Sequence, residues 1–343
     1  MKKLSLLFVS VILSLTLFTI DACGQQREPF ITRTFSASTI QTVETNTSGG
    51  SITVEGNANA QAVVEVYVSR DNWSTERIKE AFEKNYTVDI KVENGKLLVE
   101  AKQKNTITNW NRDGLNISFK ISVPKEVNTR LNTSGGSIRI SDLSGSLDFK
   151  TSGGSLNVAN VSGTVTGATS GGSITVSNAN DNINLKTSGG SITANDCNGI
   201  IYLRTSGGSL KMSNLSGNID ASTSGGSVTA NRIKGTLKTG TSGGSVRLEG
   251  ISGNVDAHTS GGSLNVEMDS VEDYIKLANS GNLNLTLPAG NGYTLNVRAN
   301  KIETSGLSDF SGNLSNTEIN GRVGNGGAEI NIRTTQRANL SFK

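Results

Sequence analysis

Residues 169–186 read TSGGSITVSNANDNINLK, and the next eighteen, 187–204, read TSGGSITANDCNGIIYLR. The opening pentapeptide returns at an unbroken spacing of 18 residues along the middle of the chain. A fixed period of this length is typical of stacked structural units, so it decides the fold. The eight regular copies begin at Thr133, Thr151, Thr169, Thr187, Thr205, Thr223, Thr241 and Thr259.

Apolar residues fall in fixed columns of this repeat. With the Thr as position 1, positions 6, 8, 11 and 15 are apolar, as in Ile174, Val176, Ala179 and Ile183. Apolar positions two apart indicate strands. We therefore predict a coil with one strand around positions 5 to 9, a bend, and a second strand around positions 14 to 18. Gly at positions 3, 4 and often 13 suits turns or close backbone approach.

A unit of two short strands cannot bury its own apolar residues, so the coils must stack, about 4.8 Å apart, with like residues in ladders. The prediction is an all-β solenoid. A β-propeller needs blades of about 40 to 45 residues, and a sandwich has loops of varied length, so both fit the constant period less well.

The expected organisation has five parts. These are a leader in residues 1–24, first strands and a first coil in 25–56, a β-rich insertion or cap with one helix in 57–130, regular 18-residue coils in 131–276, and degenerate coils with a cap in 277–343. After Thr259 the apolar column is displaced from Asp273 to Ile275, which predicts a two-residue bulge. Alternating apolar residues continue to the C-terminus at Leu283, Leu285, Leu287, Leu295, Val297, Ile330 and Ile332.

The segment before the regular array does not follow the period. Ser74 is a candidate N-cap of a helix that places Ile78, Ala81, Phe82 and Tyr86 on one face. Asn94-Gly95 is a strong hairpin signal, and Leu98 with Ala101 should continue the strand beyond it. A cap is the simplest interpretation, because an open coil end exposes unpaired backbone groups. A ligand-binding module is the alternative.

The N-terminus carries an export signal. Lys2 and Lys3 precede an apolar stretch over residues 4–20. Cleavage after Gly24 would start the mature chain at Gln25 and remove Cys23. Alternatively, residues 20–23, IDAC, resemble a loose lipobox, in which Cys23 is the candidate lipid attachment site and the only link to a membrane. The sequence leaves both routes open.

Composition restricts the classes of function. The net charge of +3 and the aromatic content of 5% give neither a basic face nor aromatic platforms for nucleic acid. Cys197 is the only cysteine besides Cys23, so the mature chain has no internal disulfide if Cys23 is lost or lipidated. Backbone pairing and packing must then stabilise the exported protein.

Residues 121–125 read ISVPK, and residues 131–138 read LNTSGGSI. With the recurrent Thr-x-x-Gly-x-Ile turn, they resemble a bacterial family of presumed adhesins built from β-strand repeats. That family is a domain of unknown function related to the head domains of autotransporter adhesins, and the resemblance covers residues 38–343. It implies a right-handed β-helix at the cell envelope, an adhesive role and no catalytic residues. This chain has Ser-Gly-Gly-Ser where many relatives have Asn-Gly-Asp, so its turns are less acidic.

Residues of chemical interest are few, and each has a structural interpretation. His258, the single histidine, should be an exposed polar residue. Cys197 lies in an apolar column and should be a buried, inert thiol. No carboxylate recurs every nine positions, which argues against a calcium roll, and no spacing supports zinc. We therefore expect no catalytic residue, no metal and no cofactor.

Two polar groups of residues invite a second interpretation. A column of Asx residues at position 10 is expected to be a turn device, with a sugar-binding row as the alternative. An acidic cluster coincides with the register break and should be a solvated loop, not a pair of catalytic acids. The column contains Asp142, Asn160, Asn178, Asp196 and Asn214, and the cluster contains Glu267, Asp269, Glu272 and Asp273.

These observations predict a non-enzymatic exported protein of the bacterial cell envelope, at the outer membrane, on the cell surface or in the periplasm. It would act as an adhesin or surface scaffold whose partner is a surface glycan or a protein. The alternative is a β-helical carbohydrate-binding or carbohydrate-active protein. Ice binding through Thr ladders fits poorly, because outward position 7 mixes Arg139, Asn157 and Thr175.

Overall fold

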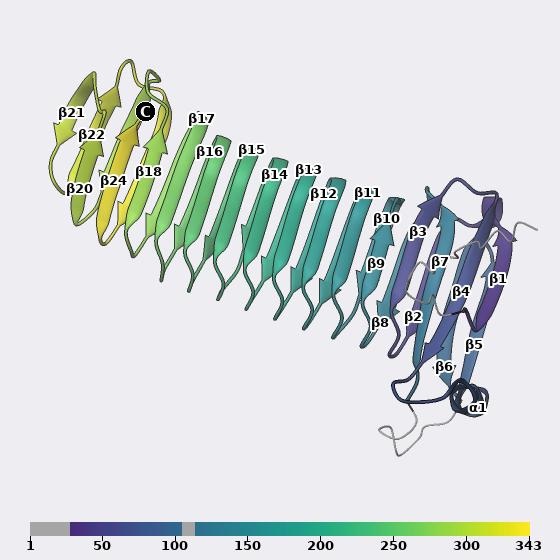
Figure 1. Ribbon diagram of the computed structural model, residues 1–343. Helices are drawn as coiled ribbons and strands as arrows, with labels where there is room; N and C mark the ends of the chain where they lie inside the picture. The colour runs from purple at the N-terminus through teal and green to yellow at the C-terminus, as the bar shows by residue number, and fades with distance from the viewer. Residues whose placement is uncertain (1–27, 105–113) are drawn as a thin grey trace, which may run out of the picture.

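The computed structural model describes residues 28–104 and 114–343, and these residues form one long all-β rod (Figure 1). The expected leader and Cys23 lie outside the described residues. Strands stack side by side from β1 (Ile31–Ser36) at one end to β20 (Lys301–Ser305) at the other. The predicted all-β solenoid is confirmed.

Each regular coil contains a single long strand that bends near its middle. Successive strands pair in parallel, and the partner of each residue in the next full coil is 18 positions later, so that Ile174 lies beside Ile192 and Ile183 beside Ile201. The long strands are β11 (Leu156–Thr169), β12 (Ile174–Thr187), β13 (Ile192–Thr205), β14 (Leu210–Ser222), β15 (Val228–Thr241), β16 (Val246–Thr259) and β17 (Leu264–Asn279).

The bend lies at position 10 of the repeat, where Asn178 has φ 50° and Asp196 has φ 54°. Short Asx side chains tolerate this left-handed conformation better than other non-Gly residues. Pairing resumes at positions 11 to 13 and does not stop at position 9 as predicted. The bend divides each long strand into two halves. The first halves build one side of the rod, here called the first sheet, and the second halves build the second sheet.

The core between the sheets is a set of aliphatic ladders. Residues at position 6, which include Ile138, Ile174 and Ile192, are almost completely buried. Position 17 is a further inward column that the sequence analysis did not include, and it holds Phe149 and Leu185. Gly167 lies between these two side chains, where any Cβ would overlap the Phe149 ring. The large Phe149 ring therefore fills the space that the missing side chain of Gly167 leaves in the next coil.

A threonine at position 1 joins each coil to the preceding one. Thr205 is 5% exposed, and its Oγ1 donates to the carbonyl oxygen of Gly190 at 2.7 Å. Thr205 Oγ1 also accepts the amide N–H of Gly208 at 3.2 Å. This pair of bonds, which we call the Thr–Gly bridge, recurs at Thr133, Thr151, Thr169, Thr187, Thr223, Thr241 and Thr259.

The predicted two-residue bulge is confirmed in β17. Gly253 lies beside Val271 while Val255 lies beside Ile275, so two extra residues are accommodated between these pairs. Asn254 is 6% exposed and its Oδ1 accepts the backbone N–H groups of Asp273 at 2.8 Å and Tyr274 at 3.0 Å. The side chain thereby replaces ladder hydrogen bonds that the bulge removes.

The N-terminal end of the rod departs from chain order. A first coil of β2 (Thr42–Thr47) and β3 (Ile52–Asn57) stacks directly on β8 (Asn128–Thr133) and β9 (Ile138–Ser141), and β10 (Ser144–Lys150) follows. The intervening chain lies outside that coil. On the second sheet it adds β6 (Lys96–Gln103) and β5 (Tyr86–Glu93); on the first sheet it adds β7 (Asn116–Pro124) and β4 (Gln61–Ser69), which is followed by β1.

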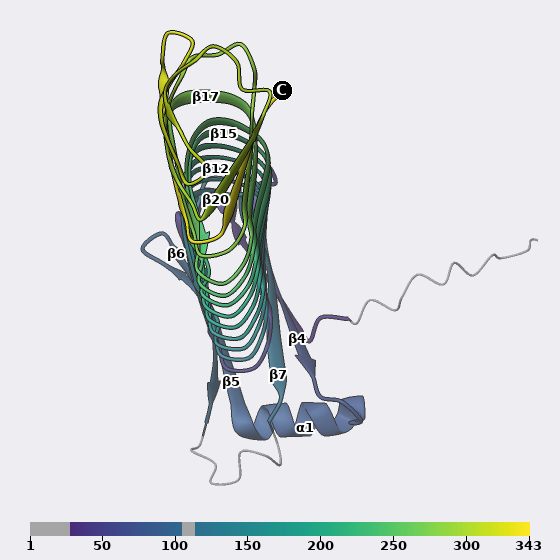
Figure 2. The same ribbon diagram turned by 90° about the vertical axis from the view of Figure 1, so that its left-hand side faces the viewer.

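The predicted helix and hairpin are both present. Helix α1 (Thr75–Asn85) begins at Ser74, whose side chain accepts the Arg77 N–H, and it buries Phe82. It links β4 to β5 and lies across the strand ends of this part of the rod (Figure 2). Asn94 and Gly95 have φ 50° and 77° between β5 and β6. A short 3-10 helix, η1 (Ala37–Thr39), follows β1.

Strand β6 contains Leu98 and Ala101, as predicted, and its inward residues are their neighbours. The strand after Asn94-Gly95 buries Leu97 and Val99, whereas Leu98 and Ala101 are only partly buried. Because side chains alternate between the two faces of a strand, a shift of one residue exchanges the inward and outward sets. The parallel pairing of β6 with β2, at Val43 beside Leu97, sets the observed register.

The C-terminal end also departs from chain order. The final strands β23 (Ala328–Thr334) and β24 (Arg337–Phe342) pair with β17 and with β18 (Leu283–Leu287). The earlier strands β19 (Tyr293–Arg298) and β20 lie outside them. The strands of residues 277–343 therefore do not stack in chain order. Inserted in this way, the last strands have a neighbour on each side.

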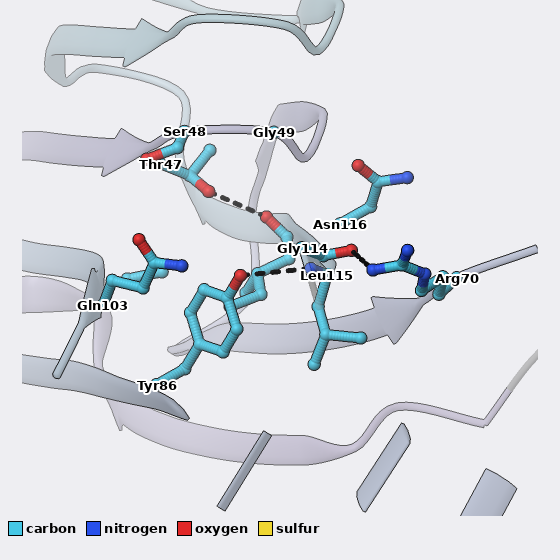
Figure 3. A pocket seen from close by; sticks show the side chains of 11 residues that line it. Thr47, Ser48, Gly49, Arg70, Tyr86, Gln103, Gly114, Leu115 and Asn116 are labelled. Carbon is cyan, nitrogen blue, oxygen red and sulfur yellow. Dashed lines mark hydrogen bonds between the residues drawn. The ribbon is translucent and has the colours of Figure 1, made fainter. Parts of the chain in front are cut away.

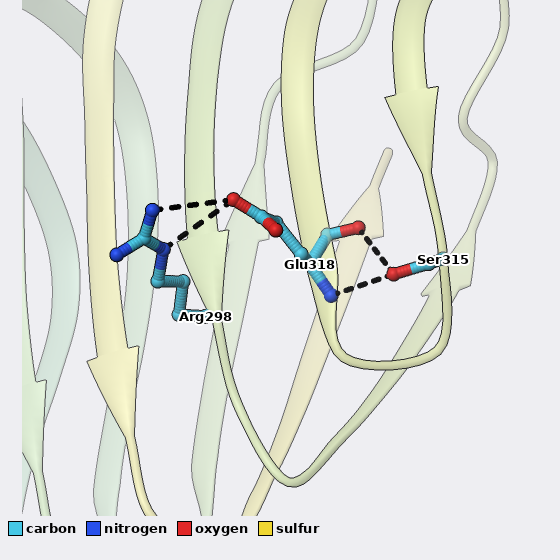
Figure 4. A network of polar contacts seen from close by, with 3 residues as sticks. All are labelled: Arg298, Ser315 and Glu318. Atoms are coloured by element: carbon cyan, nitrogen blue, oxygen red, sulfur yellow. Dashed lines mark hydrogen bonds and ion pairs between the residues drawn. The ribbon is translucent and has the colours of Figure 1, made fainter.

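An antiparallel hairpin closes the second sheet at this end. Strand β22 (Glu318–Val323) pairs with β19 and with β21 (Phe310–Leu314). Figure 4 shows its turn: the Ser315 hydroxyl donates to the Glu318 carbonyl at 3.0 Å and accepts the Glu318 N–H at 3.0 Å. Arg298 reaches the carboxylate of the same glutamate at 3.4 Å. That ion pair is exposed, so it orients the turn more than it stabilises the fold.

The two glycines of each turn predict different effects of substitution. A Cβ on Gly190 would overlap the carbonyl oxygen of Gly172, whereas one on Gly189 would make ordinary contact at 3.6 Å. We expect Gly190→Ala to lower the free energy of unfolding by about 1–3 kcal/mol, as overpacking does, and Gly189→Ala to change it by about 0.5 kcal/mol or less. Urea unfolding measures both, and equal effects would contradict the close approach at position 4.

Candidate binding groove

The structure places the predicted residues of interest in structural roles. His258 is exposed, and Cys197 is 1% exposed in its ladder, as expected. The Asx column is the turn device: Asn160 Nδ2 donates to Asp142 Oδ1 at 3.0 Å, and Asn178 repeats this contact with Asn160. These side chains bond to the equivalent side chains of adjacent coils, and their backbone has φ near 55°, so they form the bend of each coil.

The acidic cluster does not converge. Asp273 is tied to Asn254 at the bulge, and Glu267 lies 3.8 Å from Lys343 at the chain end. Within residues 28–104 and 114–343, no three His, Cys, Asp or Glu side chains gather as they would around a metal ion. In the same part of the chain, no helix has the length and apolar character that crossing a membrane requires.

A groove of about 1020 Å³ lies near the N-terminal end of the rod. Its floor is the outward face of the first sheet, where β4, β7, β3 and β9 are neighbours. Its wall is the segment between β4 and α1 together with the residues before β1. The floor presents Tyr67, Ser118, Lys120, Thr53, Glu55, Arg139 and Ser141, and the wall presents Phe30, Arg70, Trp73, Thr75 and Ile78.

Charges of both signs cross the groove floor. Lys120 Nζ lies 3.6 Å from the Glu65 carboxylate on the neighbouring strand. Burial raises the pKa of the adjacent Tyr67 hydroxyl, and the negative charge of Glu65 raises it further. Glu55 and Arg139 are exposed, and neither takes part in an ion pair within the described residues. The floor therefore offers hydrogen-bond donors and acceptors side by side.

Two of the three aromatic side chains in the groove are already engaged. The guanidinium carbon of Arg77 lies 3.8 Å from the centroid of the Trp73 ring, and that of Arg70 lies 4.3 Å from it. Phe30 packs edge-on against Phe82 of α1 at 5.0 Å. Tyr67 makes no aromatic or cation–π contact with any other described residue. Its partly buried ring is the one available for a ligand.

A second hollow of about 330 Å³ lies nearby, and three of its polar side chains bond to the backbone (Figure 3). Thr47 donates to the Ile117 carbonyl at 3.0 Å, Arg70 donates to the Gly114 carbonyl at 2.8 Å, and the Tyr86 hydroxyl accepts the Leu115 N–H at 3.1 Å. These bonds hold the start of β7 in place, so we assign this hollow a structural role.

No protein-family model matches the chain, and no curated protein matches it. Among solved structures, a presumed cell adhesion protein of Clostridium sporogenes is 12% identical, covers 91% of this chain and 98% of its own, and has a TM-score of 0.20. A presumed adhesin of Bacteroides fragilis is 10% identical, with coverage of 91% and 96% and a TM-score of 0.25. A presumed lipid-binding protein of Parabacteroides distasonis is 16% identical, with coverage of 91% and 96% and a TM-score of 0.31. These likenesses are too low to argue function.

The groove is not evident from the sequence pattern. Its floor joins residues from strands that are distant in sequence, such as Tyr67 beside Ser118 and Thr53 beside Arg139. One local signal was present: Glu65 and Tyr67 alternate with the inward Val64 and Val66, which places a ring on the outward face.

The buried thiol gives a prediction for reactivity. Burial raises the pKa of Cys197, so the folded protein holds this proton at a pH where the unfolded chain loses it. The contribution of this thiol to the free energy of unfolding is present below the pKa of Cys197 in the unfolded chain. It is lost as pH rises through the pKa of Cys197 in the folded protein. We expect iodoacetamide at mildly alkaline pH to modify Cys197 only in denaturant, as mass spectrometry would show. Rapid modification of the native protein would contradict the burial.

Proposed function

We propose that this chain is a non-enzymatic, exported protein of the cell envelope, an adhesin or surface scaffold. The observation that carries the proposal is the uninterrupted stack of coils, each of which forms one rung of the rod. Fifteen strands pair side by side in the first sheet, which spans roughly 67 Å at a spacing of about 4.8 Å. Such a rod holds a binding surface at a fixed distance from its point of attachment.

The surface of the rod supports a binding role. Outward positions carry short polar and charged side chains on a backbone that is paired on both sides, so a partner would meet a preformed surface. Within the described residues, His258 is exposed and Cys197 is buried in an apolar ladder, so these two side chains lie in structural positions. The groove beside α1 brings polar, charged and aromatic side chains together in one hollow.

Attachment to the envelope is assigned to the N-terminus. The apolar leader in residues 4–20 supports export, and Cys23 is the proposed lipid attachment residue. A lipid at Cys23 would tether the rod within a few residues of β1, the outermost strand of the first sheet. The regular coils would then extend away from the membrane.

Labelling of intact cells tests this proposal. Cells that make the wild-type protein should bind an antibody to the rod without permeabilisation, and the protein should incorporate labelled palmitate. The Cys23→Ala variant should lose the palmitate and appear in the medium or the soluble fraction. Unchanged palmitate labelling of the variant would exclude Cys23 as the anchor, and an antibody signal that requires permeabilised cells would exclude surface display. Turnover in a polysaccharide hydrolysis screen would exclude a purely structural or adhesive role.

A further inference from the structure

The groove beside α1 is the place where another element overhangs the outward face of the first sheet. Along the regular coils that face carries small polar and charged residues at positions 5, 7 and 9, such as Ser173, Thr175 and Ser177. Over β9, β3, β7 and β4 the same row continues through Arg139, Thr53 and Lys120 to Glu65. What distinguishes the groove is the wall beside these rows, which adds Phe30, Arg70 and Trp73.

The chemistry of these groups selects a class of ligand. A carboxylate, a guanidinium, an ammonium and several hydroxyls lie side by side on the floor, which suits a neutral ligand that both donates and accepts hydrogen bonds at many points. A polyanion would meet the carboxylates of Glu28 and Glu55. An alkyl chain would desolvate the charged side chains of the floor without replacing their hydrogen bonds. An unengaged ring, Tyr67, completes the site with an apolar platform.

The spacing of the floor is also regular. Adjacent strands lie about 4.8 Å apart, so equivalent side chains on β4, β7, β3 and β9 repeat at that interval across the groove. This interval is close to the length of one pyranose ring in a chain of linked sugars. Hydroxyl groups on successive rings would therefore meet successive strands.

We propose that this groove binds an oligosaccharide, with Tyr67 stacking on a sugar ring and Glu55, Lys120 and Arg139 bonding its hydroxyl groups. The inference deepens the proposed function, since it names the ligand class of an adhesin. It assigns the contacts to floor residues and not to Trp73, whose ring already holds Arg70 and Arg77.

Binding of the full-length protein to a glycan array tests the assignment. Wild-type protein should bind a defined set of oligosaccharides. Tyr67→Ala and Arg139→Ala should each weaken that binding about tenfold or more, as loss of a stacking ring or of a charged hydrogen bond does. Tyr67→Phe, which keeps the ring, should stay within about threefold of wild type.

Tyr202→Ala is the matched control. Tyr202 faces outward on β13, where it contacts Lys186 and Arg204 in the second sheet. The Tyr202→Ala variant should therefore bind glycans as the wild-type protein does. Arg139 is exposed, so its substitution separates lost binding from lost folding, and circular dichroism of each variant checks the fold.

Three results would overturn the assignment: no glycan binding by wild type, equal binding by wild type, Tyr67→Ala and Arg139→Ala, or binding to a peptide array in place of the glycan array. A blank glycan array for a protein that is displayed on intact cells would refute the ligand class and leave the proposed function standing. Glycan binding by a protein that is absent from the cell surface would refute surface display and leave the ligand class standing.

Discussion

The structure depends on one constraint: the backbones of successive coils must approach closely at the Gly of position 4. That approach lets the position-1 threonine donate to the Gly carbonyl of the preceding coil while it accepts the Gly N–H of its own. A buried amide and carbonyl without partners would each be costly, so the threonine hydroxyl satisfies groups that parallel pairing leaves open at the turn. Every rung that repeats these residues is fixed in register with its neighbour.

The threonine-to-glycine bond of this bridge crosses both places where stacking departs from chain order, although Gln336 replaces a glycine as the N–H donor at Thr334. Thr133 donates to Gly50 across the N-terminal junction at 2.8 Å, and Thr334 donates to Gly281 across the C-terminal junction at 2.6 Å. At both ends, strands close to a terminus are inserted beside the regular stack, and the last pairing at three of the four sheet ends is antiparallel. Antiparallel strands thus occupy the sheet ends, except at β20, where charged Lys301 and Glu303 mark the edge. Charges on an edge strand discourage pairing with other chains.

The period of the sequence was sufficient to predict the regular coils, because each inward residue repeats at the same position and packs on its own counterpart. Local patterns also predicted α1 from Ser74 and the turn at Asn94-Gly95, since capping and left-handed turns are decided within a few residues. Alternation alone could not show that β23 lies between β17 and β19, because the pattern identifies a strand but not its neighbour. The groove was missed for the same reason: Tyr67 and Arg139 become part of one surface only when β4, β7, β3 and β9 are placed in order.

Distances between spin labels at outward position 7 test the stacking most directly. With labels in a Cys23→Ala background, where Cys197 is buried and does not react, the pairs Arg139→Cys with Lys211→Cys and Arg139→Cys with Arg247→Cys lie four and six rungs apart. The account predicts separations of roughly 19 Å and 29 Å, an increase of about 4.8 Å for each 18 residues. Distances that do not grow in proportion to the number of repeats would contradict it.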